Sequence, residues 1–259
     1  MYRKMMIRID TVALFAAVGI VAAGCAKDPS KSVPAAQVAE SARDKVAEQA
    51  GDEAAKAPAA EPTAAEPAAA EPAAVGAGAG EAAAAPAAPA AGAVALTGFI
   101  GAVGSKVTGS HELKFATWQG AVELADGKAE GGSLSFDVEV GSVIADWKEP
   151  GAYSAKLEGH LKGADFFDVE KFPKATFKST AISAGGEGAS HTITGDLTLR
   201  GVTKQVRFPA TITVAADAIT GKAEFSINRK DFGIVYAGKA DDLIRDGVVL
   251  QLDLTGTRG

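Results

Sequence analysis

The 259-residue chain has few of the residues that usually carry chemistry or brace small folds. It contains one cysteine, Cys25, and three histidines, His111, His160 and His191. A single thiol cannot form an internal disulfide. No histidine has a second histidine or cysteine at the spacing typical of a metal site. We therefore expect neither a disulfide framework nor a bound metal ion.

Motifs of catalysis are also missing. The sequence has no G-x-S-x-G motif and no Ser/His/Asp arrangement. The "DFG" at residues 231–233 lacks the glycine-rich and catalytic loops of a kinase, and the "VGAGAG" at 75–80 lacks the lysine of a phosphate-binding loop. Adjacent carboxylates at 241–242 would point to opposite faces of a strand, which does not favour an acid–base pair. We predict a protein that is not an enzyme and needs no cofactor.

Positive charge is scarce and scattered. The formal net charge is −6, and residues 97–259 carry 18 Lys and Arg against 21 Asp and Glu. Nucleic-acid binding requires a concentrated basic face that releases counterions from phosphates. The sequence therefore excludes nucleic acid as the expected partner.

Aromatic residues are absent from residues 26–95. Ten of the eleven phenylalanines follow residue 97, whereas eight of the eleven prolines precede it. The segment consists mainly of Ala, Pro, Glu and Gly, with "EP" repeated at Glu61, Glu66 and Glu71. Such a composition buries too little apolar surface to repay its ordering entropy. We predict a disordered tether over 26–95 and a single domain over 96–259.

Long hydrophobic runs are absent as well. The uncharged apolar run at 11–22 follows Arg3, Lys4 and Arg8, and it is shorter than the ~20 residues that span a bilayer. This pattern predicts a secretory signal peptide over 1–25. The run ends in "VAAGC", which resembles a bacterial lipobox and implies lipidation of Cys25. The alternative is an ordinary signal peptide with a cysteine near its end by chance.

The lipobox resemblance has consequences for location. It implies a lipoprotein in the cell envelope, facing the periplasm and held to a membrane through Cys25. The residue that follows, Ala26, is not acidic, and the resemblance to lipoprotein sorting then favours the outer membrane.

From residue 97 onward the sequence alternates between apolar and polar residues, as half-buried antiparallel strands do. Turn-forming segments separate the alternating runs, and we expect each run to form a strand. The expected strands lie near 98–106, 110–117, 120–125, 131–143, 174–184, 190–200, 204–216, 219–229 and 246–257. Repeated short strands predict a sandwich or a closed barrel. The two longest runs, 131–143 and 204–216, favour an all-β, antiparallel barrel over a small sandwich. A barrel of eight strands has an interior that can hold side chains or one ligand.

One helix interrupts the strands. Tyr153, Leu157 and Leu161 recur at helical spacing after Pro150, which predicts about three turns of helix. We expect Phe166 and Phe167 to end this helix, and Pro173 and Phe177 to belong to the following strand.

Two residues of the "INRKDFG" segment have expected local roles. Gly233 is predicted to form a bend. Arg229 is predicted to pair with a carboxylate, with Asp168 and Asp231 as candidates.

Four segments together resemble the YceI-like family. They are "GHLKGADFFDVEKFPKATFKST" (159–180), "ITGDLTLRGVTKQVRFPATI" (193–212), "AEFSINRKDFGI" (223–234) and "IRDGVVLQLDL" (244–254). The resemblance covers residues 97–259. It implies an extended lipocalin-like barrel with a helix over one end and an elongated apolar cavity. It also implies binding of a polyisoprenoid chain or a quinone tail.

Apolar residues that alternate along the strands and the helix are the candidates for lining this cavity. They are Phe136, Val138, Leu157, Leu161, Phe166, Phe177, Leu197, Leu199, Phe208, Phe225, Ile227, Leu250 and Leu252. Each could equally fill a solid core. The first hypothesis is non-catalytic binding or transport of a long apolar lipid. The alternative is an envelope stress or interaction protein whose filled barrel binds a protein partner.

Overall fold

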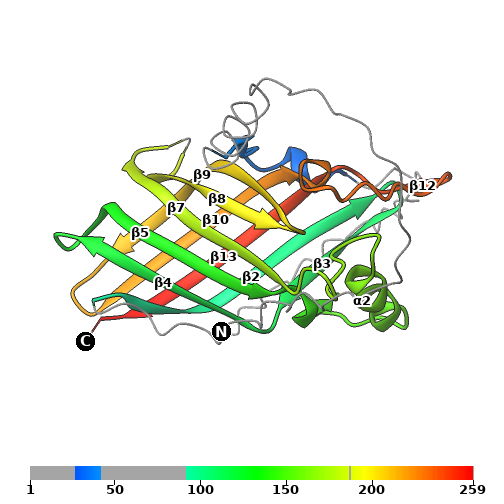
Figure 1. The fold of residues 1–259 in the computed structure, drawn as a ribbon, viewed down its shortest axis with the longest axis horizontal. Helices are drawn as coiled ribbons and strands as arrows, with labels where there is room; N and C mark the ends of the chain where they lie inside the picture. Colours follow the sequence, from blue (N-terminus) through cyan, green and yellow to red (C-terminus); the bar gives the residue numbers. More distant parts are fainter. Residues whose placement is uncertain (1–26, 42–91, 187, 259) are drawn as a thin grey trace, which may run out of the picture.

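The computed structural model describes residues 27–41, 92–186 and 188–258 (Figure 1). The predicted signal peptide, Cys25 and most of the predicted tether lie outside these residues. Among the described residues, no helix has both the length and the apolar character needed to cross a membrane.

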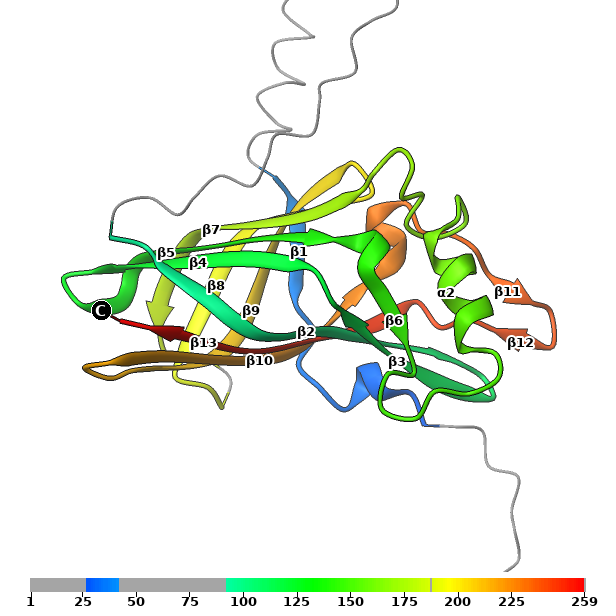
Figure 2. The same ribbon diagram turned by 90° about the horizontal axis from the view of Figure 1, so that it is seen from below.

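Eight antiparallel strands close into a barrel, which confirms the predicted fold class (Figures 1 and 2). Each strand pairs with its neighbours around the ring, and the last strand closes it by pairing with the first. The barrel strands are β2 (Val94–Lys106), β4 (Trp118–Ala125), β5 (Lys128–Glu139), β7 (Lys174–Ala184), β8 (His191–Leu199), β9 (Val202–Val214), β10 (Ala218–Asn228) and β13 (Gly247–Thr257).

Shorter elements extend the barrel at one end. The first two residues of β2 pair with β4, and residues 101–106 of β2 pair with β3 (Gly109–Phe115), which in turn pairs with β6 (Val143–Ala145). A two-stranded hairpin of β11 (Gly238–Lys239) and β12 (Asp242–Leu243) lies at the same end. Two 3₁₀ helices, η2 (Val140–Ser142) and η3 (Arg229–Phe232), follow β5 and β10.

The helix α2 (Ser154–Lys162) covers this end of the barrel and is shorter than predicted (Figure 2). It stops because Gly163 turns to an extended conformation, with φ −72° and ψ 174°. Phe166 and Phe167 therefore do not end the helix. They lie in the turn after it, where the Phe167 amide donates to the Leu161 carbonyl at 3.0 Å.

The barrel wall has a gap between β9 and β10. Strand β9 pairs with β8 along residues 202–210, but it pairs with β10 only along residues 211–214. The two strands diverge beyond that point. The backbone groups on this edge of β9 therefore need other partners.

Residues 27–41 fill the gap, which corrects the prediction of a tether that is disordered from residue 26. Strand β1 (Gln37–Glu40) pairs antiparallel with residues 204–207 of β9. On the other side, the Ala36 amide donates to the Ser226 carbonyl at 2.8 Å, and the Ser226 amide donates to the Pro34 carbonyl at 2.9 Å. The N-terminal segment thus bridges β9 to β10 as an added strand.

Side chains also hold the N-terminal segment in place. Ala36 and Val38 pack against the hydrophobic core. Ser41 is fully buried, and its hydroxyl donates to Asp196 Oδ1 at 3.2 Å. Glu40 pairs with Lys204. These contacts explain why a segment with so few branched residues is ordered.

Candidate functional site: an apolar cavity in the barrel

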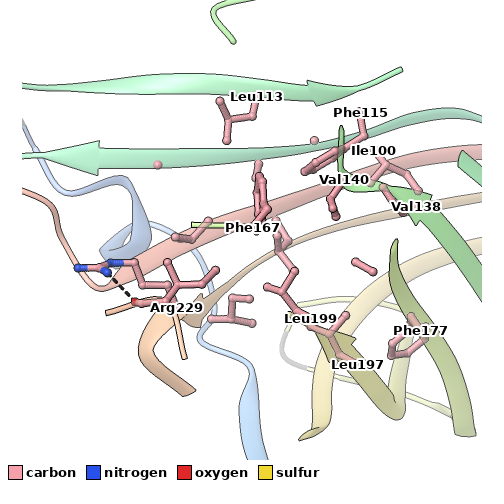
Figure 3. Close-up of a pocket in the computed structure, with 18 of the residues that line it drawn as sticks. Ile100, Leu113, Phe115, Val138, Val140, Phe167, Phe177, Leu197, Leu199 and Arg229 are labelled. Atoms are coloured by element: carbon pink, nitrogen blue, oxygen red, sulfur yellow. Dashed lines mark hydrogen bonds between the residues drawn. The ribbon is translucent and has the colours of Figure 1, made fainter. Parts of the chain in front are cut away.

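The barrel encloses a cavity of about 190 Å³, and part of its lining is drawn in Figure 3. Leu161 of α2 and Phe166 and Phe167 in the turn after it are among the lining residues. Strand alternation directs every second side chain inward, so Ile100, Ala102 and Gly104 of β2 share the inner face. Among the described residues that line the cavity, Arg229 and Arg245 are the charged ones, and nearly all the others are apolar. The surroundings suit a hydrocarbon and disfavour an ion.

Twelve of the thirteen residues predicted to bind a ligand line this cavity. They are Phe136, Val138, Leu161, Phe166, Phe177, Leu197, Leu199, Phe208, Phe225, Ile227, Leu250 and Leu252. The thirteenth, Leu157, lines a neighbouring pocket between the helix and the β11–β12 hairpin. The structure therefore brings twelve of the predicted residues together around one cavity and places Leu157 at the pocket beside it.

Sequence reasoning missed much of the β2 side of the cavity. Ile100, Ala102 and Gly104 line it, and so do Leu113 and Phe115 of β3. The signal was present in "GFIGAVGS", because a strand rich in small inward residues leaves space that larger residues would fill. A Cβ atom added to Gly104 would meet no atom within 4 Å, which shows that this space is open.

Four phenylalanines form the floor of the cavity. The ring centroids of Phe136 and Phe177 are 5.7 Å apart, as are those of Phe177 and Phe208. Phe208 and Phe225 stack with their centroids 4.0 Å apart. Phe208 also lines a small pocket of about 40 Å³ on the far side. The aromatic row therefore divides the barrel interior into a large chamber and a small one.

Arg229, labelled in Figure 3, lines the cavity just after the end of β10, where Asn228 pairs with Gly247 at the start of β13. Its guanidinium donates to the carbonyls of Ile234 at 2.6 Å and Arg245 at 3.1 Å, and to Asp246 Oδ1 at 3.2 Å. Burial lowers the pKa of Arg229 from its usual value, and the negative charge of Asp246 partly offsets this.

The predicted carboxylate partners of Arg229 were wrong. The guanidinium pairs with Asp246, and neither Asp168 nor Asp231 takes that place. Asp168 pairs instead with Lys171 at 3.0 Å. Gly233 adopts a left-handed conformation with φ +72° at the end of η3, which agrees with the predicted bend.

A second pocket of about 300 Å³ forms the mouth of the cavity. We define the mouth by α2 on one side and the β11–β12 hairpin on the other. The rings of His160, Phe166 and Tyr236 meet there, with centroids 5.0–5.5 Å apart. Six residues border both the mouth and the inner cavity, and we call this shared boundary the neck. They are Gly104, Ser105, Leu113, Leu161, Phe166 and Ile244.

A carboxylate holds the hairpin against the mouth. Asp242 accepts hydrogen bonds from the Lys106 ammonium group and, at 2.9 Å, from the Thr108 hydroxyl. The hydrogen bond from Lys106 is the main cause that lowers the pKa of Asp242 below its usual value. This hairpin wall is therefore fixed to the β2–β3 turn at neutral pH.

The three histidines are each near a single carboxylate. His111 Nδ1 lies 3.0 Å from Asp146, His160 Nε2 lies 3.1 Å from Asp165, and His191 Nε2 lies 3.5 Å from Glu130. Within the described ranges, no three metal-ligating side chains come together.

Comparisons with known proteins agree with this architecture. A model of the YceI-like domain matches residues 89–256, which is more than half of the chain. The protein belongs to the YceI-like family. The match spans all eight strands of the barrel and begins shortly before β2.

Relatives and solved structures extend the family evidence. A UPF0312 protein of Pseudomonas putida strain W619 is 37% identical over 128 residues, which cover 47% of this chain and 59% of that protein. A UPF0312 protein of Pseudomonas fluorescens is 33% identical over 143 residues, covering 53% and 70%. The crystal structure of BcnA from Burkholderia cenocepacia superposes with a TM-score of 0.53 at 25% identity, covering 61% of this YceI-like chain and 94% of BcnA.

Proposed function

We propose that this YceI-like protein binds one long apolar lipid chain in its barrel, non-covalently and without catalysis. The observation that carries the proposal is the open cavity of about 190 Å³ with a nearly all-apolar lining. Its walls are strands of a closed barrel, so the site is formed in advance and binding costs little ordering.

The size of the cavity indicates how the ligand fits. An apolar cavity of ~150 Å³ holds a molecule such as benzene. The inner cavity alone therefore holds only part of a long chain. The remainder would pass through the neck into the mouth, which offers about 300 Å³ more. A narrow, unbranched or methyl-branched chain suits this shape, and an isoprenoid chain or quinone tail is the class that the family resemblance implies.

The energetics favour such a ligand. Each buried methylene contributes about 0.8 kcal/mol. A few isoprene units inside the barrel are then sufficient for tight binding. The alternative, a filled barrel whose outer surface binds a protein, is disfavoured by the open space beside Gly104.

We also infer that the protein is a lipoprotein of the cell envelope. Residues 1–25 have the pattern of a signal peptide that ends at a lipobox-like cysteine. Lipidation of Cys25 would hold the barrel at a membrane, with the outer membrane favoured. Substituting Cys25→Ser should release the protein into the soluble envelope fraction. Unchanged membrane retention would show that another feature holds it there.

The binding proposal is tested by what purifies with the protein. The full chain carrying Cys25→Ser is isolated from bacterial cells without detergent, and its organic extract is analysed by mass spectrometry. We expect one apolar lipid chain per protein. The same variant with Gly104→Leu should lose this lipid, because leucine would occupy the neck.

A matched control separates loss of the cavity from loss of the fold. Gly109→Leu also adds a leucine where a Cβ meets no atom within 4 Å, but Gly109 does not line the cavity or its mouth. We expect this variant to retain the lipid. An extract of the parent protein without stoichiometric lipid would contradict the proposed function.

A further inference from the structure

We propose that the mouth end of the barrel is a face that contacts a phospholipid bilayer. The proposal rests on the lipid anchor at Cys25 that the proposed function includes. The new element is the orientation of the anchored barrel, with its mouth end toward the bilayer. The N-terminal segment and a set of exposed apolar side chains both point to the same end.

Exposed large apolar side chains gather at the mouth end. Among the described residues there are four, with exposed fractions of 79% for Tyr153, 65% for Val235, 48% for Leu243 and 39% for Ile144. Tyr153 precedes α2, Val235 lies between η3 and β11, Leu243 is on β12, and Ile144 is on β6. These elements lie together at one end of the molecule (Figure 2).

The opposite end has a different character. Its hairpin turns are formed by Asp126 and Gly127 between β4 and β5, and by residues 215–217 between β9 and β10. These are small or acidic residues. A bilayer interface favours exposed tyrosine, leucine and valine over such residues. Acidic residues such as Glu149, Asp165 and Asp241 are exposed at the mouth end too. The two ends therefore differ in exposed large apolar side chains, which among the described residues are at the mouth end.

The N-terminal segment places the anchor beside the mouth. Asp28 Oδ2 lies 3.8 Å from Arg245 Nε, and Arg245 lines the cavity. A Cβ atom on Gly247 would lie 2.2 Å from Ser30 Oγ, so η1 (Pro29–Lys31) packs directly on the start of β13. The pairing of β1 with β9 fixes the rest of the segment along the barrel wall.

Chain geometry then limits how far the anchor can be. Cys25 precedes Lys27, the first described residue, by two positions. Consecutive Cα atoms are 3.8 Å apart, so the two Cα atoms lie within about 8 Å of each other. A lipidated Cys25 would hold this rim of the barrel against the bilayer. The occupant of the apolar end is therefore a bilayer rather than a protein.

The arrangement has a functional consequence. The anchor supplies the attachment, and the apolar tips near the mouth supply the orientation, since membrane attachment is secured by two combined signals. The mouth would open onto the lipid phase. An apolar chain could then move between the bilayer and the cavity without crossing water.

Photocrosslinking in cells tests this orientation. The full chain is produced in a Gram-negative bacterium with p-benzoylphenylalanine at Tyr153 or Leu243, or at Lys128 or Ala216 near the opposite end. After irradiation, mass spectrometry of the purified protein detects phospholipid adducts. We expect the adduct yield at Tyr153 and Leu243 to exceed that at Lys128 and Ala216 by at least about tenfold.

A backbone variant tests the role of the docked segment. Ala36→Pro removes the amide that donates to Ser226, because proline has no N–H. With the photoreactive residue at Leu243, Ala36→Pro should lower the adduct yield several-fold. Ala36→Ser keeps the donor and should leave the yield unchanged.

Each result decides the proposal. Equal yields at the two ends, higher yields at Lys128 and Ala216, or no phospholipid adducts at any position would overturn it. The lipid content of the cavity is measured separately in the Cys25→Ser protein. A filled cavity without oriented adducts would overturn only the membrane face. Oriented adducts with an empty cavity would overturn only the proposed function.

Discussion

The ring of Phe208 on β9 lies face to face with the ring of Phe225 on β10, with 4.0 Å between centroids and 11° between planes. This pair forms part of the cavity floor at the point where the two strands begin to diverge. Their stacking across the start of the gap links the shape of the cavity to the stability of the wall.

Phe208→Ala should lower the free energy of unfolding by about 3–5 kcal/mol, because it leaves a large void in a packed aromatic row. Urea denaturation measures this change. The substitution should also join the inner cavity to the small pocket beneath it, so that a longer apolar chain fits. Ligand affinity should therefore continue to rise with chain length up to a longer ligand than in the parent protein.

Phe232 provides the control. It is 0% exposed and does not line the cavity, the mouth or the pocket beneath the floor. Phe232→Ala should cost similar stability without changing the preferred chain length. If both variants accept the same ligands, the aromatic row is not the floor of the site.

Ala36→Pro should detach the N-terminal segment from the barrel. The loss of one backbone hydrogen bond to Ser226 costs roughly 1 kcal/mol, and the pairing of β1 would weaken with it. Hydrogen exchange followed by mass spectrometry should show faster exchange in residues 34–41 and 204–207. Ala36→Ser should exchange like the parent protein. Unchanged protection in the proline variant would show that side chains alone hold the segment.

The hairpin at the mouth should loosen in acid. The pKa of Asp242 is lower in the folded protein than its ordinary value, chiefly because Lys106 donates a hydrogen bond to it. A lowered pKa means that the ionised carboxylate adds stability above the ordinary aspartate pKa of about 3.9. That stability is lost as the pH falls through the lowered pKa.

Carboxyl NMR titration measures this directly. Asp242 should titrate at a lower pH than an ordinary aspartate, whose pKa is about 3.9, and Lys106→Met should raise its midpoint toward that value. Lys239→Met removes a charge from the same hairpin without removing a hydrogen bond to Asp242, and should shift the midpoint less. An Asp242 midpoint at the ordinary aspartate value in the parent protein, or one that Lys106→Met leaves unchanged, would contradict the hydrogen-bonded arrangement.

The barrel could be predicted because its signal is local. Alternating apolar residues along each strand identify the inner face without knowledge of the neighbours. For that reason Phe136, Phe177 and Leu250 could be assigned to one interior before their strands were placed. The same alternation cannot show how much of that interior is empty, which depends on small residues such as Gly104 on another strand.

The parts that the sequence did not reveal depend on distant contacts. Val38 is the only branched apolar residue in β1, so the segment's own sequence gives little sign of order. It is ordered because β9 and β10, more than 150 residues later in the sequence, separate and leave room for β1 to pair with β9. Arg229 and Asp246 are 17 positions apart in the sequence, and they meet because η3 and the β11–β12 hairpin fold back between β10 and β13. Only at Phe166 was the error local, since the glycine at 163 already indicated an earlier helix end.

We propose that the barrel holds an apolar chain that enters through the neck beside Gly104. Isothermal titration of the Cys25→Ser protein with prenyl alcohols of increasing length tests it most directly. Affinity should rise by at least about tenfold for each added isoprene unit until the cavity and mouth are full, and then level off. Gly104→Leu should abolish this dependence, whereas Gly109→Leu should preserve it. Affinity that is independent of chain length, or unaffected by Gly104→Leu, would contradict the account.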